Sequence, residues 1–117
     1  MADIAPAQSW TRTAGDPLLA EIVARLVAAY HPERIYLFGS CARGEAHADS
    51  DYDLMIVVRD DAPDALRRSR VAYEALWGLP AAADVLVWTH TAFEERLHLR
   101  ASLPSAITRE GTLVYAA

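Results

Sequence analysis

The chain has 117 residues, of which 53% are hydrophobic and 23% charged, and a formal net charge of −5. This length and composition predict one globular domain with a modest core and exclude an intrinsically disordered chain. The acidic balance argues against direct nucleic-acid binding, the absence of lysine excludes a phosphate-binding P-loop, and the single cysteine excludes an internal disulfide.

The first 15 residues have neither a helical nor a strand period and are rich in Ala, Pro, Ser, Thr and Gly. They predict a flexible N-terminal tail, so that the domain itself spans residues 16–117. The tail lacks the basic flank and apolar stretch of a secretory signal, and no run approaches the length of a membrane span. We therefore expect a cytoplasmic protein that does not contact a membrane.

A helix and a strand come first in the domain. Asp16 and Pro17 are a typical helix start, apolar residues recur at helical spacing as far as Tyr30, and the His-Pro pair at 31–32 ends the helix. Residues 34–38 form an apolar strand. We expect this helix to pack on the sheet and to carry no chemistry.

A turn and a second strand follow. Residues 39–44 predict a tight turn and a short helix that ends at Gly44, and residues 45–50 predict a polar loop. The second strand covers residues 52–58 and is apolar on both faces, which is typical of a sheet covered on each side. The short connection favours antiparallel pairing of the first two strands.

The rest of the chain alternates helix with strand. A helix is predicted over 64–77 and a strand over 84–89. Thr91 and Glu94 form a capping box, which predicts a helix that continues to about Arg100. A helix over 102–110 and a short strand over 112–115 complete the chain. This alternation predicts a single α/β domain with a mixed β-sheet flanked by helices.

Asp51 and Asp53 lie at the start of the second predicted strand. Residues two apart on a strand point to the same face, about 6.6 Å apart along the chain. Two carboxylates that close repel each other unless a cation lies between them, and Mg²⁺ suits such a pair. The alternative is a solvated pair of loop carboxylates. A calcium-binding EF-hand loop does not fit, because its required Gly and Glu positions hold Leu54 and Asp60.

Gly39 and Ser40 form a candidate phosphate-binding turn. Glycine lets the backbone turn sharply and approach a ligand closely. A helical turn from Ser40 would direct its free N–H groups and its hydroxyl at a phosphate. Arg43 either contacts the same phosphates or pairs with a nearby carboxylate. A phosphate-binding turn beside metal-binding carboxylates predicts a nucleotide site.

These motifs resemble a known family. Gly39-Ser40, ten residues, then Asp51-x-Asp53 is similar to the signature of DNA polymerase β-like nucleotidyltransferases. The strings GSCARG and SDYDL resemble the minimal nucleotidyltransferases, which are antitoxins commonly encoded beside HEPN-type partners. Asp84, in DVLV, matches the family's third carboxylate. The resemblance covers roughly residues 16–115; Cys41, where the family more often has Arg, is a departure.

The resemblance implies a nucleotidyltransferase fold and a metal-dependent reaction. It implies that ATP is the substrate and that AMP passes to a hydroxyl, expected to be a tyrosine, of a HEPN toxin held in a hetero-oligomer. Two Mg²⁺ ions would be held by the catalytic carboxylates, which are Asp51, Asp53 and Asp84. The nucleoside triphosphate would be bound by the matching residues Gly39, Ser40 and Arg43.

Several alternatives fit the same residues. The chain could neutralise its partner by binding with little or no catalysis, or it could modify a small molecule. Asp84 could be a turn residue bonded to nearby backbone. His47 and His90 are expected near the site, either touching substrate or as ordinary surface residues. Of the three tryptophans, Trp10 is the one most expected to meet a partner, and the others are assigned to core or interface.

Overall fold

The computed structural model describes residues 16–39 and 52–117. Several predictions of the sequence therefore lie outside the described residues: those on the tail 1–15 and on Ser40, Cys41, Arg43, His47 and Asp51. Within the part of the chain that the structure describes, no helix is both long and apolar enough to cross a membrane.

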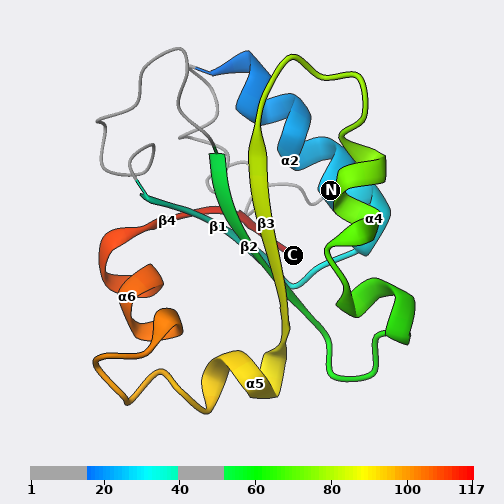
Figure 1. The fold of residues 1–117 in the computed structure, drawn as a ribbon. Coiled ribbons are helices and arrows are strands. Elements are labelled where there is room, and N and C mark those ends of the chain that lie inside the picture. Colours follow the sequence, from blue (N-terminus) through cyan, green and yellow to red (C-terminus); the bar gives the residue numbers. More distant parts are fainter. Residues whose placement is uncertain (1–15, 40–51) are drawn as a thin grey trace.

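A four-stranded mixed sheet forms the centre of the described chain (Figure 1). Its strands are β1 (Arg34–Phe38), β2 (Tyr52–Val58), β3 (Ala83–Thr89) and β4 (Thr112–Ala116). Their order across the sheet is β3-β2-β1-β4; β1 is antiparallel to β2 and β4, whereas β2 and β3 are parallel. The predicted mixed sheet and the antiparallel pairing of the first two strands are confirmed.

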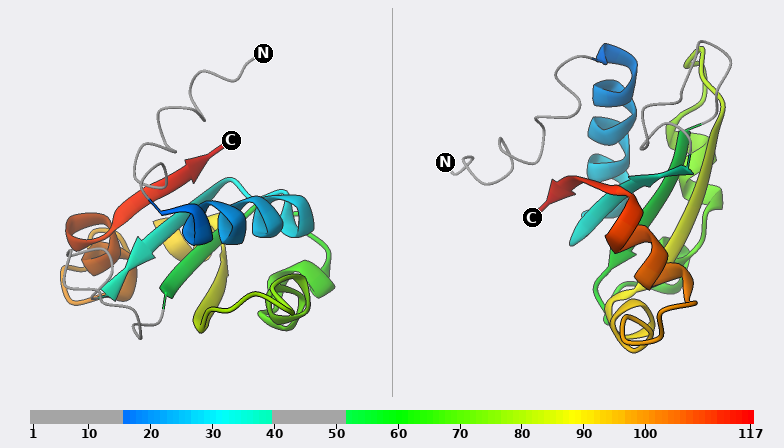
Figure 2. Two further views of the ribbon diagram at one scale, coloured as in Figure 1. Left: turned by 90° about the horizontal axis from the view of Figure 1, so that it is seen from above. Right: turned by 90° about the vertical axis from the view of Figure 1, so that its left-hand side faces the viewer.

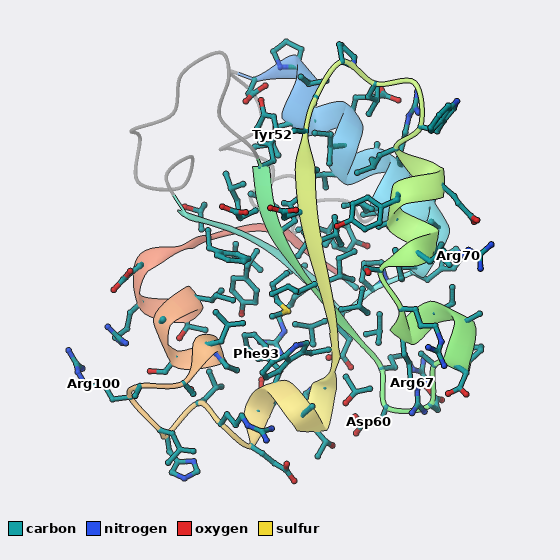
Figure 3. All side chains as sticks on the ribbon, viewed as in Figure 1. Tyr52, Asp60, Arg67, Arg70, Phe93 and Arg100 are labelled. Atoms are coloured by element: carbon teal, nitrogen blue, oxygen red, sulfur yellow. The ribbon has the colours of Figure 1, made fainter. Side chains whose placement is uncertain are left out.

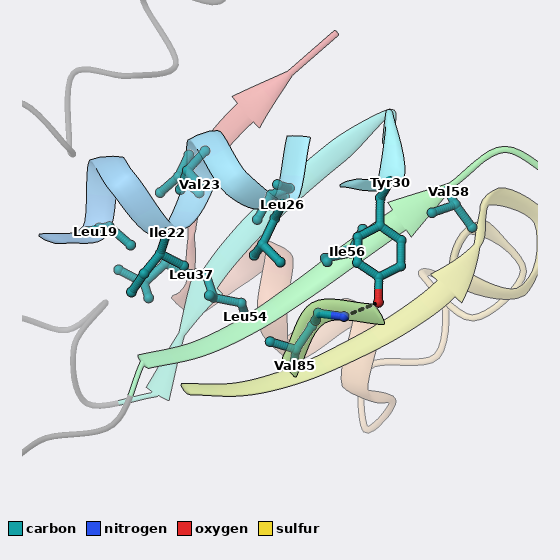
Figure 4. Packing of buried hydrophobic residues seen from close by; sticks show 13 residues of the cluster. Leu19, Ile22, Val23, Leu26, Tyr30, Leu37, Leu54, Ile56, Val58 and Val85 are labelled. Atoms are coloured by element: carbon teal, nitrogen blue, oxygen red, sulfur yellow. Dashed lines mark hydrogen bonds between the residues drawn. The ribbon is translucent and has the colours of Figure 1, made fainter. Parts of the chain in front are cut away.

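Helix α2 (Pro17–Tyr30) covers one face of this sheet (Figure 4). The Asp16 carboxylate accepts a hydrogen bond from the Leu19 amide at 3.0 Å, and the helix ends at His31, whose φ of 49° is left-handed. Both ends agree with the prediction. The buried side of the helix packs against apolar residues of the strands, among them Leu37, Leu54, Ile56 and Val85.

The helix predicted over residues 64–77 is divided in two. The 3-10 helix η2 (Asp64–Arg67) and helix α4 (Arg70–Ala75) are separated at Arg68, whose backbone is extended. The hydroxyl of Tyr30 donates to the Arg68 carbonyl at 2.5 Å and accepts from the Ala72 amide at 2.9 Å. Those two backbone groups would bond to each other in a continuous α-helix. The Tyr30 hydroxyl therefore takes the place of one helical hydrogen bond (Figure 4).

Two short helices pack on the other face of the sheet. They are α5 (His90–Glu94) and α6 (Leu103–Glu110). Phe93 and Ile107 bury their side chains there against β1 and β2. Figure 2 shows these helices on the side of the sheet away from α2. The predicted start of α6 at Ser102 and its end at Gly111 are confirmed.

The predicted capping box at Thr91 is wrong. Thr89 caps α5 by accepting from the Ala92 amide at 3.3 Å, and the helix ends at Glu94 rather than near Arg100. Thr91 instead donates to the Asp60 carboxylate, from its amide at 2.8 Å and from its hydroxyl at 2.5 Å. Asp60 follows β2 and is distant from Thr91 in the sequence. Thr91 therefore bonds to a residue of another segment instead of capping its own helix.

Candidate functional site

Asp53 and Asp84, two of the three predicted carboxylates, are neighbours in the sheet. They are paired with each other in the parallel register of β2 and β3. Adjacent strands lie about 4.8 Å apart, and paired residues point to the same face. The sheet therefore places two carboxylates side by side. Asp84 lies within strand β3, not in a turn, and its carboxylate makes no hydrogen bond to another described residue.

Gly39 lies against the first of these carboxylates. It follows Phe38, which is paired with Asp53 across β1 and β2, and its φ is 77°. A Cβ added at Gly39 would overlap Oδ2 of Asp53. The site therefore needs glycine for two reasons: the left-handed backbone conformation, and the space that the Asp53 carboxylate occupies.

Among the described residues, the face that carries the two carboxylates is less covered at their end than further along the strands. Met55 and Val57, further along β2 on the same face, are fully buried beneath the short helices. Leu86, the next residue after Asp84 on this face of β3, is 39% exposed. Figure 1 shows that α5 joins the opposite end of β3, away from the start of β2. Asp84 itself is exposed and Asp53 is half-buried.

The donor set suits a hard cation such as Mg²⁺. Two adjacent carboxylates supply oxygen ligands, and their mutual repulsion favours a cation between them. No group of three or more His, Cys, Asp or Glu side chains could hold a metal ion within residues 16–39 and 52–117. The third predicted ligand, Asp51, lies outside those ranges. Asp53 and Asp84 therefore fit as part of a metal site that Asp51 would complete.

His90 does not lie near these carboxylates, so that expectation is wrong. It follows β3, six residues after Asp84, which on an extended strand is about 20 Å away. Its Nδ1 lies 2.7 Å from Oε1 of Glu33, and this hydrogen bond raises the pKa of His90. A separate hollow of about 270 Å³ is lined by Glu33, His90 and three residues that follow β2. His90 belongs to that charged cluster.

The sequence did not reveal two features close to Asp84. The Tyr73 hydroxyl, from α4, accepts a hydrogen bond from the Val85 amide at 3.4 Å. Trp77, in the turn after α4, is 84% exposed. An aromatic residue in a helical apolar pattern gives no signal that its side chain will face outward, so neither contact nor exposure could be found without the tertiary arrangement.

The fold and the paired carboxylates agree with the family to which the sequence matches. Residues 18–114 match the model of the nucleotidyltransferase domain, and the chain belongs to this family. The match spans all four strands and reaches from α2 to β4. It therefore covers both carboxylates and Gly39. No curated protein matches the chain.

Several solved structures share the fold. One is a toxin–antitoxin with AMP-PNP, with a TM-score of 0.53, 21% identity, and coverage of 82% of this chain and 72% of that chain. A protein of Sulfolobus solfataricus classed as a nucleotidyltransferase has a TM-score of 0.56 and 20% identity, and the match covers 98% of this chain and 90% of that chain. A mutant toxin–antitoxin pair, MntA-HpeT, has a TM-score of 0.51 and 19% identity, and the match covers 81% of this chain and 71% of that chain. At these identities the likeness is one of fold.

Proposed function

We propose that this chain is a metal-dependent nucleotidyltransferase that moves AMP from ATP to a hydroxyl group of a protein. The observation that carries the proposal is the pairing of Asp53 with Asp84 in the register of β2 and β3, which puts two carboxylates side by side on one face of the sheet. Gly39 supports it, because the start of the predicted phosphate-binding turn lies beside the Asp53 carboxylate. Membership of the nucleotidyltransferase family supports the class of reaction.

Each predicted site residue has a role in this proposal. The three carboxylates, with Asp51 added to the pair described above, would hold two Mg²⁺ ions, which in such sites stabilise the attacking and leaving oxygens. Gly39, Ser40 and Arg43 would bind the β- and γ-phosphates of ATP. The acceptor oxygen bonds to the α-phosphorus, the bond to pyrophosphate breaks, and the hydroxyl proton passes to Asp84 or to solvent.

The acceptor in this proposal is a HEPN-type toxin that forms a hetero-oligomer with this chain. Two of the structures with the same fold are toxin–antitoxin assemblies, and one of them contains AMP-PNP, an analogue of ATP. The resemblance of the motif at residues 39–53 to the antitoxin nucleotidyltransferases supports the same partner. The expected acceptor is a tyrosine hydroxyl on the toxin.

The test is transfer to the protein encoded by the neighbouring reading frame. The two purified proteins are incubated with ATP and Mg²⁺, and the intact mass of the partner is recorded. We expect the partner to gain one or more AMP units, and we expect no gain with EDTA or with the Asp53→Asn variant. A partner that binds this chain but gains no mass would refute transfer.

Neutralisation by contact alone is the second candidate function. The 84% exposure of Trp77 favours it, because an exposed tryptophan is typical of a protein-binding surface. The double variant Asp53→Asn with Asp84→Asn separates the two functions in cells that express the toxin. Full protection by the double variant would mean that contact suffices, whereas loss of protection with binding retained would mean that transfer is required.

A further inference from the structure

Two aromatic side chains project from α4 and the turn after it. Tyr73 is 48% exposed and Trp77 is 84% exposed. Arg70, Tyr73 and Glu74 occupy positions i, i+3 and i+4 of α4, which lie on one side of that helix. Trp77, in the turn that follows, lines the same groove as these three residues. We call Tyr73 and Trp77 the aromatic ridge. Figure 3 shows Arg70 on the outer side of α4, away from the sheet.

Two grooves meet at the aromatic ridge. The first has a volume of about 670 Å³ and extends from the ridge to Ser69 and Arg70. The second has a volume of about 480 Å³ and extends from the ridge past Leu79 to Ala83. Tyr73 and Trp77 line both grooves, so the ridge is bordered on both sides by space that a partner's side chains could fill.

The backbone beneath the ridge is firmly held. Nη1 of Arg25, on α2, donates to the carbonyls of Ala75 and Trp77 at 3.2 Å each. The Tyr30 hydroxyl also bonds to the amide of Ala72, one residue before Tyr73. A rigid aromatic side chain on a fixed backbone loses little conformational entropy when it is bound, which favours affinity.

The ridge is next to the candidate active site. Ala83, at the end of the second groove, directly precedes Asp84, and the Tyr73 hydroxyl bonds to Val85, which directly follows it. β3 is an edge strand of the described sheet, so no other strand of that sheet separates the groove from the face that carries Asp84. A protein bound on the ridge could therefore extend around this edge and reach the carboxylates.

We infer that the aromatic ridge and its two grooves dock the acceptor protein. The partner would place a bulky apolar side chain against Tyr73 and Trp77. Nε of Arg70 lies 3.3 Å from Oε2 of Glu74, and a partner's carboxylate would replace Glu74 in this exposed ion pair. This inference rests on the proposed function and names the surface that holds its acceptor. Tyr, Trp and Arg are the residue types enriched at binding hot spots, and the Arg70 side chain is 85% exposed.

A second copy of this chain fits the ridge less well. Two copies would each carry a formal net charge of −5 and would repel each other. Four aromatic side chains bury roughly 150–250 Å² each at most, and the monomer already buries part of that area. The total stays below about 1,000 Å², which is less than a stable dimer needs. A larger partner that fills both grooves would not have this limit.

The experiment measures binding of the neighbouring-frame protein by calorimetry and its modification by intact mass. Wild type is compared with Trp77→Ala, Arg70→Glu and the control variant Leu99→Ala. Leu99 suits as a control because it is also an apolar residue at the surface, 50% exposed, but lies between α5 and α6, away from the ridge. Trp77→Ala should weaken Kd by roughly thirtyfold, the effect of a hot-spot truncation. Arg70→Glu should weaken it in a salt-dependent way. Leu99→Ala should leave Kd unchanged, and all variants should bind ATP with Mg²⁺ as wild type does.

The outcomes separate this inference from the proposed function. If wild type modifies the partner and Trp77→Ala binds and modifies it as well as wild type, the docking surface is wrong and the proposed function stands. If wild type neither binds nor modifies the partner, both fail. Sedimentation of this chain alone tests the remaining occupant, since a dimer that dissociates in Trp77→Ala would assign the ridge to a second copy and overturn the inference.

Discussion

Replacing Gly39 with alanine tests the close approach of the backbone to the Asp53 carboxylate. An L-residue held at the φ of 77° observed here pays roughly 1–2 kcal/mol for the left-handed conformation. The added Cβ also overlaps Oδ2 of Asp53, so the carboxylate must leave its rotamer, at roughly 0.5–1.5 kcal/mol. We expect Gly39→Ala to lower the free energy of unfolding by about 2–3 kcal/mol.

Gly78→Ala is a matched control for this change. Gly78 has a φ of 91°, and a Cβ added there would meet nothing within 4 Å. Gly78→Ala is destabilised only by the left-handed backbone conformation, so Gly39→Ala should be about 1 kcal/mol less stable than Gly78→Ala. Urea unfolding measures this difference. Calorimetric titration with ATP and Mg²⁺ should show weaker binding for Gly39→Ala and unchanged binding for Gly78→Ala.

Two results would contradict the close contact between Gly39 and the Asp53 carboxylate. Equal losses of stability in the two alanine variants, with equal affinity for ATP, would mean that the Cβ at position 39 does not displace Asp53. A double-mutant cycle gives the second check. Gly39→Ala should cost less in an Asp53→Ala background, because the clashing carboxylate is gone, and strict additivity would contradict the contact.

Three further predictions follow from other contacts. Asp84→Asn should keep the thermal midpoint and lower the transfer rate by roughly 10²–10³, because the amide lacks the charge that helps to hold a cation. Tyr30→Phe should lower the free energy of unfolding by roughly 1–3 kcal/mol, because the Arg68 carbonyl loses the hydroxyl that donates to it and the Ala72 amide keeps only its bond to the Ser69 carbonyl. His90→Gln should lower the thermal midpoint at about pH 5.5 and have little effect at about pH 8.5. The reason is that the hydrogen bond with Glu33 raises the pKa of His90 in the folded state. The stabilisation that charged His90 gives the fold is therefore complete below about pH 6.5 and is lost as the pH rises through the raised pKa.

Each of these predictions has a result that contradicts it. Transfer by Asp84→Asn within a few-fold of wild type would remove Asp84 from the carboxylate set. An unchanged stability in Tyr30→Phe would mean that the two hydrogen bonds of the Tyr30 hydroxyl do not stabilise the fold, the Ser69 carbonyl being a sufficient partner for the Ala72 amide. An equal effect of His90→Gln at both pH values would mean that its contribution does not depend on the charged imidazole.

The elements whose signals are local could be predicted from the sequence. The ends of α2 are set by Asp16 and by the His-Pro pair at 31–32, and the structure places them there. The four strands, α6 and the mixed sheet were also predicted correctly. Gly39 could be singled out as a position that needs glycine. These features depend on backbone conformation and on the period of apolar residues, which each segment carries in its own sequence.

The contacts between groups distant in sequence depend on the packing of the folded chain. The Tyr30 hydroxyl divides the helix predicted over 64–77, and Asp60 takes the Thr91 groups assigned to a cap, because each partner comes from a segment that the local pattern does not include. The pairing of Asp53 with Asp84 depends on the register of two parallel strands. The position of Trp77 at the surface depends on how α4 packs, since only packing decides which side of a short helix faces solvent.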